Sequence, residues 1–432
     1  MRPIWCAYSL LFFTVIMIVI AFIIRSYMDQ GHVGEFFYDQ DRLRNTLHKY
    51  FVYEETRGER VARKEREQVI ERWRKYGDGT EGVKTILYWN TMKVEQDFMF
   101  GTGDIFQGCP VPHCYATTER HLDDIKDFHA ILFNGIEIRF RDLPAGRSPH
   151  QRYIFFTWES PSSRRIRPAN FVLKPDYYNW TISYRLDSDI IRPFGMVRDI
   201  LTDEIVAPPR NPTDAVTWRY PEYLLEVDTA ELNLIKKKKR MAAWFASRCI
   251  SDSKREILVD ELRTHFEVDI YGDCGPLQCD QKNLEDCYDI VERDYYFYLS
   301  FENTLCKDYV TEILFQPLSR NVIPVVYGGA DYTKFAPPHS YINVMDFNST
   351  AELARFMYRL VDDPMGYHSY FWWKNYYRLE DASKPTLCDL CAKLHDDDLP
   401  AKQLRNFMKY YIVGQCFSPE SLPWYYTLRY LP

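Results

Sequence analysis

Arg255 stands where a chain of this pattern could bind a diphosphate. Residues 241–247 (MAAWFAS) are predicted to form a buried strand, and Ser253 and Glu256 form a capping box that would start the next helix. Arg255 then falls in the first turn of that helix, where free backbone N–H groups and the helix dipole attract anions. The alternative is a solvated arginine that pairs with Asp252 or Glu256.

The next strand-to-helix junction carries groups that could bind a sugar. Asn303 follows a predicted strand, residues 296–301, and residues 308–318 are predicted to form a helix. Tyr309 and Glu312 are three positions apart on that helix and therefore share a face. A carboxylate at this place could accept hydrogen bonds from ribose hydroxyls. The alternative is a capped helix whose tyrosine is simply packed.

A regular scaffold must hold these residues, and the second half of the chain predicts one. Strands are expected at residues 268–271 and 322–326, and Ser349 and Glu352 form a second capping box before an amphipathic helix. Alternating strands and helices predict a mostly parallel sheet covered by helices. Ligands of such sheets bind beyond the carboxyl ends of the strands.

The first half of the chain has shorter apolar runs, separated by proline and polar clusters. From about Gly82 onward, the predicted strands are residues 85–89, 130–133, 153–158 and 181–184. Proline-containing stretches between Ala207 and Pro221 indicate a linker between the halves. A chain of 432 residues is long enough for two domains and an anchor.

The first residues indicate a membrane-anchored protein of the secretory pathway. Residues 4–24 contain no charged side chain and are long enough to span a bilayer as a helix. No small-residue cleavage site follows them, which favours an uncleaved anchor over a signal peptide. The densely charged residues 54–75 have no continuous apolar stripe, so we expect a stem there rather than a packed helix. The net charge of −7 argues against a nucleic-acid partner.

Cysteines and glycosylation motifs favour a body in the lumen. Of eleven cysteines, Cys6 lies in the predicted anchor, which leaves an even number that suits disulfides. Two N-x-S/T sequons begin at Asn179 and Asn348, and such motifs accept glycans only in the lumen.

The junction around Asn303 resembles the signature of the eukaryotic α1,3-fucosyltransferase family. The chain reads FYLSFENT at 297–304 and DYVTE at 308–312. The similarity covers roughly residues 85–395, with further matches at residues 159–161, 179–190, 241–247, 268–272, 322–328, 336–342 and 388–391.

This resemblance implies an α/β fold of GT-B type, with two Rossmann-like domains that face a cleft. It also implies a single-pass type II protein of the Golgi membrane with its catalytic body in the lumen; a homo-oligomer is possible. The expected parts are a cytoplasmic tail (1–3), a transmembrane signal anchor (4–24), a stem (25–82), an acceptor-side domain (83–235), a GDP-fucose-binding domain (236–375) and a C-terminal segment that packs back on the first domain (376–432).

The family transfers L-fucose from GDP-fucose with inversion, which implies a glycan acceptor whose N-acetylglucosamine receives fucose on its 3-hydroxyl. Such a displacement needs a base for the acceptor proton and a cationic group for the departing diphosphate. The resemblance assigns the base to Glu159 and the diphosphate contact to Arg255. It assigns further donor-binding roles to Ser247, Asn303, Tyr309 and Glu312, with Glu312 for the ribose.

Two departures from the family pattern bear on activity. The lysine of the usual T-E-K segment is Ile313 here, and the usual S-N after the first donor-side strand is Ser247-Arg248. We hypothesise that Arg248 binds the donor and supplies the missing positive charge. The alternative is a non-catalytic relative that binds GDP or a glycan.

The resemblance also implies disulfide partners and argues against an obligatory metal. Cys109 and Cys114 would be bonded to Cys388 and Cys391, and the further candidate pairs are Cys287–Cys306 and Cys249–Cys274. Asp187 and Asp189 form a D-x-D triplet, but this family's fold does not use D-x-D to hold a donor metal. Cys388-x-x-Cys391 lacks a second pair at zinc-ligand spacing.

Overall fold

The computed structural model describes residues 57–76, 82–90, 100–136, 138–139, 141–162, 176–220, 229–279, 284–399 and 402–421. The chain divides into a unit that ends at Arg60 and a compact unit that begins at Val61, and the second is the subject below. Among the described residues, no helix combines the length and apolar character needed to cross a membrane. The predicted anchor at residues 4–24 lies outside the described residues.

Six parallel strands form the first sheet, in the order β2-β1-β3-β4-β5-β6. They are Lys84–Tyr88 (β1), Cys114–Thr117 (β2), Ala130–Asn134 (β3), Arg152–Thr157 (β4), Trp180–Ser183 (β5) and Ile190–Ile191 (β6). The four strands predicted in this half are present, each within one residue of its predicted ends. β3 is buried along its whole length, as expected of a parallel strand covered on both faces.

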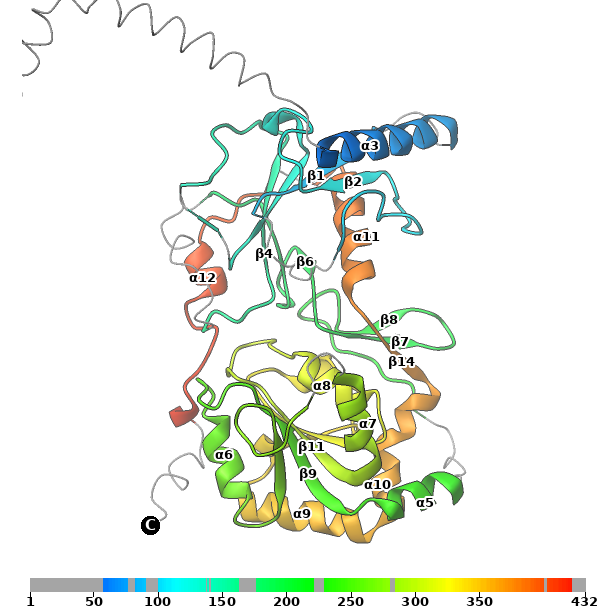
Figure 1. The fold of residues 1–432 in the computed structure, drawn as a ribbon, viewed down its shortest axis with the longest axis vertical. Helices are drawn as coiled ribbons and strands as arrows, with labels where there is room; N and C mark the ends of the chain where they lie inside the picture. The colour runs from blue at the N-terminus through cyan, green and yellow to red at the C-terminus, as the bar shows by residue number, and fades with distance from the viewer. Residues whose placement is uncertain are drawn as a thin grey trace, which may run out of the picture. The chain divides into compact units, whose positions relative to one another are not determined.

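Helices from the two ends of the described chain cover this first sheet. Helices α3 (Arg57–Tyr76, from Val61 onward) and α12 (Phe407–Tyr411) pack on one face through Ala62, Val69, Phe407 and Tyr411. Helix α11 (Ser383–Leu394) packs on the other face. Figure 1 shows α11 and α12 beside the first sheet, at the red end of the colour scale, so the C-terminal part of the chain returns to the first domain.

Five parallel strands form the second sheet, in the order β10-β9-β11-β12-β13. They are Arg240–Phe245 (β9), Val268–Tyr271 (β10), Tyr295–Phe301 (β11), Ile323–Tyr327 (β12) and Ile342–Asn343 (β13). Helices α6 (Arg255–Leu262) and α9 (Thr350–Asp362) bury one face, while α7 (Leu284–Asp294) and α8 (Glu312–Leu318) cover the other (Figure 1). Helices α5 (Thr229–Lys237) and α10 (Pro364–His368) contact each other beside this sheet.

A small antiparallel sheet combines strands that precede the second large sheet in the sequence with one strand that follows it. Its strands are Met196–Asp199 (β7), Ile205–Ala207 (β8) and Tyr377–Glu380 (β14), in the order β14-β7-β8. The two large sheets are parallel and covered by helices, so the predicted α/β architecture is confirmed.

The prediction of an unpacked stem at residues 54–75 is wrong for the part from Val61 onward. Ala62 and Val69 of α3 are buried against the first sheet. The hydroxyl of Tyr115 donates a hydrogen bond to the Ala62 carbonyl at 2.7 Å, and Arg66 forms an ion pair with Asp123. These contacts hold the helix against the sheet without a continuous apolar stripe.

The helix predicted at residues 308–318 begins only at Glu312, which corrects our prediction. Asp308 has a left-handed backbone, with φ of 61°, and its carboxylate accepts a hydrogen bond from the Leu186 backbone at 3.2 Å. Thr311 caps α8 by accepting a hydrogen bond from the Ile313 N–H. Tyr309 and Glu312 therefore do not share a helix face; a loop brings them together instead.

Candidate active site

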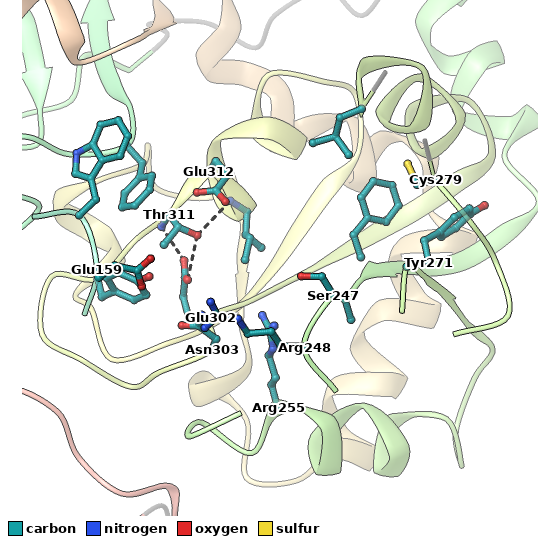
Figure 2. A pocket seen from close by; sticks show the side chains of 18 of the residues that line it. Glu159, Ser247, Arg248, Arg255, Tyr271, Cys279, Glu302, Asn303, Thr311 and Glu312 are labelled. Atoms are coloured by element: carbon teal, nitrogen blue, oxygen red, sulfur yellow. Dashed lines mark hydrogen bonds between the residues drawn. The ribbon is translucent and has the colours of Figure 1, made fainter. Parts of the chain in front are cut away.

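A cavity of about 480 Å³ opens at the carboxyl ends of strands from both large sheets. Residues that follow β3 and β4 line it from the first sheet, and residues that follow β9, β10 and β11 line it from the second. It contains every residue predicted for catalysis or donor binding: Glu159, Ser247, Arg248, Arg255, Asn303, Tyr309 and Glu312. Figure 2 shows Glu159 at the left of this cavity and Arg248 and Arg255 in its lower part.

Arg255 is a buried cation in the cavity wall. It is the first residue of α6, and 4% of its surface is exposed. Its Nη1 donates to the Phe301 carbonyl at 2.5 Å, and its guanidinium carbon lies 5.6 Å from the centre of the Trp244 ring. Its Nε has no hydrogen-bond partner in the part of the chain that the structure describes. A buried guanidinium with a spare donor is suited to an oxyanion.

The helix that carries Arg255 does not begin with the predicted capping box. Lys254 occupies the cap position with φ of 55°, and no side chain caps the helix. Ser253 instead donates to the Glu302 carbonyl at 2.6 Å, and Glu256 accepts from the Ser251 hydroxyl at 2.7 Å. This hydrogen bond links the loop before α6 to the end of β11, two residues before Arg255. In the second predicted capping box, Ser349 caps α9 as expected by accepting from the Glu352 N–H at 3.1 Å, but the Glu352 carboxylate accepts from the Asn348 N–H at 3.1 Å, one residue before the cap.

Arg248 is an exposed cation three residues after the end of β9, and it also lines the cavity. Within the described ranges it makes no hydrogen bond or ion pair, so its charge is not neutralised by a carboxylate there. Ile313 lies in the same wall but packs with an apolar group that includes Phe245, Tyr271 and Tyr288. The cavity therefore has a second positive group at position 248 and a hydrocarbon surface at position 313.

Glu302 is a cavity residue to which the sequence analysis gave no role. Its carboxyl group is buried and accepts hydrogen bonds from the Thr311 N–H at 2.7 Å and the Thr311 hydroxyl at 3.1 Å (Figure 2). Burial raises the pKa of Glu302 to about 8. A glutamate that directly follows an aromatic-rich, almost fully buried strand was the available signal. Glu302 holds the loop between β11 and α8, and near neutral pH it adds little negative charge to the cavity.

The Glu312 carboxyl group is close enough to Glu159 to feel its negative charge. Glu312 is exposed on the cavity wall, yet surrounding protein atoms raise its pKa, and the negative charge of Glu159 raises it further. Tyr309 combines the two roles considered for it, since it is packed in the core and also faces the candidate donor site. It is buried, packs edge-to-face on Tyr184 with ring centres 4.9 Å apart, and still lines the cavity.

We expect replacement of Glu302 by glutamine to remove a pH dependence of stability. The pKa of this carboxyl rises from an ordinary 4.5 to about 8 on folding, so the folded protein keeps a proton that the unfolded chain loses in this window. Stability of the unmodified protein then falls as pH rises through the window, by up to about 1.4 kcal/mol per pH unit. Denaturant unfolding of both proteins between about pH 5 and about pH 8 measures the difference. Identical slopes would contradict the assignment.

One of the two predicted glycosylation sites is wrong. Asn179 is buried; its side-chain oxygen accepts from the Tyr153 N–H at 2.8 Å, and its side-chain nitrogen donates to the Lys402 carbonyl at 2.9 Å. The nitrogen that would carry a glycan is therefore buried and hydrogen-bonded inside the fold. Asn348 is exposed just before α9, where a glycan can be accommodated.

Five disulfides are present in the described part of the chain. Three join cysteines as anticipated: Cys109–Cys388, Cys114–Cys391 and Cys249–Cys274. The candidate pair Cys287–Cys306 is wrong, because Cys287 bonds to Cys279 and Cys306 bonds to Cys416. The structure instead brings the C-terminal segment to Cys306.

Side chains of the protein occupy the groups that resembled metal motifs. Asp187 forms an ion pair with Arg185 at 2.5 Å, and Asp189 accepts from Lys402 at 2.6 Å. Among the described residues, Cys114, Cys391 and His395 have potential ligand atoms within 4.8 Å of one another. The two sulfurs, however, are bonded to each other as a disulfide.

Comparisons with known proteins assign both halves of the chain to the same family. A family model described as "Glycosyltransferase family 10 (fucosyltransferase) C-term" matches residues 235–410, and one described as "Fucosyltransferase, N-terminal" matches residues 81–195. A crystal structure of an α1,3-fucosyltransferase aligns with 76% of this chain and 93% of its own, at 15% identity and a TM-score of 0.45, which is too distant to transfer residue roles.

Curated relatives are more similar. Alpha-(1,3)-fucosyltransferase C of Drosophila melanogaster is 44% identical over 291 residues, which are 67% of this chain and 66% of that protein. The Bos taurus enzyme named 3-galactosyl-N-acetylglucosaminide 4-alpha-L-fucosyltransferase FUT3 is 33% identical over 66% of this chain and 70% of its own length. Matches to the Drosophila protein and to fut-1 of Caenorhabditis elegans span 66% and 60% of those relatives, slightly under two thirds. With both domain models and these relatives in agreement, this chain belongs to the family 10 fucosyltransferases.

Proposed function

We propose that this protein is an inverting α1,3-fucosyltransferase that moves L-fucose from GDP-fucose to the 3-hydroxyl of N-acetylglucosamine on a glycan. The observation that carries the proposal is one cavity with Glu159 from the first sheet and Arg255 and Arg248 from the second. A carboxylate opposite cationic groups is what a displacement with a diphosphate leaving group requires. The printed names of the relatives give the same reaction class.

The proposed fold is of GT-B type, and each side of its cavity has a separate task in the inverting transfer. The Glu159 carboxylate takes the proton from the acceptor hydroxyl as that oxygen attacks the anomeric carbon. The Arg255 guanidinium holds the negative charge that develops on the departing diphosphate. Asn303, Glu312 and Ser247 bind the sugar and ribose hydroxyls of the donor, which fixes the anomeric carbon between the two sides.

Arg248 supplies the second cation in this proposal. Its guanidinium has no carboxylate partner in the described part of the chain, and it lines the same cavity as Arg255. Ile313 cannot take this role, because a hydrocarbon side chain offers no charge to a phosphate. A non-catalytic relative that only binds GDP is the competing function, and Ile313 is the feature that would favour it.

The cellular setting follows from the same proposal. Five disulfides support folding in an oxidising compartment, in agreement with a body in the Golgi lumen behind an anchor at residues 4–24. Neither a tightly bound cofactor nor an obligatory metal enters the proposed mechanism.

Incubation of the full chain with GDP-fucose and a panel of N-glycan acceptors tests the proposal. The panel should include acceptors that offer only the chitobiose core and acceptors that offer only an outer antenna. Formation of a fucosylated product supports the proposed reaction, and its formation in the presence of a chelator supports a reaction without a metal. Binding of GDP without any product would overturn it and support the non-catalytic alternative.

A further inference from the structure

The last described residues form a strap, residues 407–417, which lies against the first sheet. Phe407 and Tyr411 pack on Phe155 of β4, with ring centres 4.8 and 5.1 Å away. The match to the C-terminal family model ends at residue 410, so most of the strap lies beyond the matched region.

The other end of the strap holds the loop between β11 and α8. Cys416 is bonded to Cys306 of that loop. The Lys307 N–H donates to the Gln415 carbonyl at 2.8 Å, and the Phe417 N–H donates to the Leu305 carbonyl at 3.0 Å. This loop leads directly to Tyr309, Thr311 and Glu312 of the cavity wall. The strap therefore fixes one boundary of the donor side covalently.

The middle of the strap reaches Glu159. The Tyr411 hydroxyl donates a hydrogen bond to the Glu159 carbonyl. On its other side, the Glu159 N–H donates to the Thr157 hydroxyl at 3.1 Å. Both polar groups of the Glu159 peptide backbone are thus held, one by the end of β4 and one by the strap.

We propose that the strap positions Glu159 relative to the donor loop, through Tyr411 at the Glu159 end and the Cys306–Cys416 bridge at the loop end. This inference rests on the proposed function, in which Glu159 is the base. A base acts on a hydroxyl only within hydrogen-bond reach, and a displacement of about 1 Å can reduce the rate by about a hundredfold. Tyr411 is a positioning residue, since its hydroxyl contacts the backbone of Glu159 and not a substrate.

Replacement of Tyr411 by phenylalanine tests this role, with Tyr410→Phe as its matched control. The Tyr410 hydroxyl contacts Ser183 at 3.1 Å and Ser188 at 2.9 Å, so its loss removes hydrogen bonds from the same strap without touching Glu159. We expect Tyr411→Phe to lower kcat by about tenfold or more with the KM for GDP-fucose unchanged. Tyr410→Phe should keep kcat near that of the unmodified protein. Equal kcat values for the two variants would overturn the inference.

A second measurement does not depend on activity. In the Cys306→Ser, Cys416→Ser double variant, we expect amide hydrogen exchange to become faster at residues 157–160 and 305–312 together, because one strap holds both segments. Unchanged exchange at residues 157–160 would overturn the inference, whatever the activity assay gives. Absence of fucosyl transfer by the unmodified protein would instead count against the proposed function.

Discussion

Replacement of Glu159 by glutamine is expected to reduce fucosyl transfer by about 10²–10⁴-fold. The amide has nearly the same shape as the carboxylate but cannot take the acceptor proton. GDP binding should change little, because Arg255, Arg248 and Asn303 lie in other parts of the cavity wall. Turnover assays give kcat, and calorimetric titration gives the Kd for GDP.

A matched control uses a glutamate away from the cavity. Glu267 is exposed between α6 and β10 and does not line the site, so Glu267→Gln should retain full activity. Transfer by Glu159→Gln at the rate of this control would show that another group takes the proton.

Replacement of Arg248 by asparagine is expected to produce the second-largest loss of activity. Opposite unit charges about 4 Å apart interact by about 4 kcal/mol at an effective dielectric constant near 20. Since about 1.36 kcal/mol corresponds to a tenfold change in rate, loss of this cation should reduce kcat/KM by roughly 10²–10³-fold. Lysine at position 248 should retain more activity than asparagine. Arg263→Asn, which changes an exposed arginine beyond the end of α6, is the control.

The double variant Arg248→Asn, Ile313→Lys examines the exchange of cation positions directly. A lysine at position 313 enters the cavity wall from the first turn of α8, where the family pattern has its lysine. Activity lost in Arg248→Asn should therefore return in the double variant, as measured by kcat/KM for GDP-fucose. If Arg248→Asn leaves turnover unchanged, the charge is supplied elsewhere.

Local sequence pattern predicted most strands of both sheets but not the irregular segments. The apolar runs at β3, β9, β10 and β11 are long enough to identify strands, and their parallel pairing follows from the alternation with helices. The segment 302–311 was misread as partly helical, because its conformation depends on Leu186 and Glu302, which are not its helical neighbours.

The predicted residues of the site share one cavity, yet several groups that organise it were missed. Residue types at strand ends and the family resemblance were enough to select Glu159, Arg255 and Glu312. Glu302 acts by binding Thr311, and Tyr411 contacts a carbonyl 252 positions earlier in the chain. Such groups have no local pattern, since their partners are defined only once the chain has folded.

The bridges Cys109–Cys388 and Cys114–Cys391 span 279 and 277 residues of the chain. During synthesis, Cys109 and Cys114 can form these bonds only after residues 388 and 391 have been made. The first domain therefore cannot complete its disulfides before the second domain has been synthesised, so the two domains do not mature strictly one after the other. A chain that stops before Cys388 would leave Cys109 and Cys114 unpaired, and the face of the first sheet that α11 covers would be exposed to solvent.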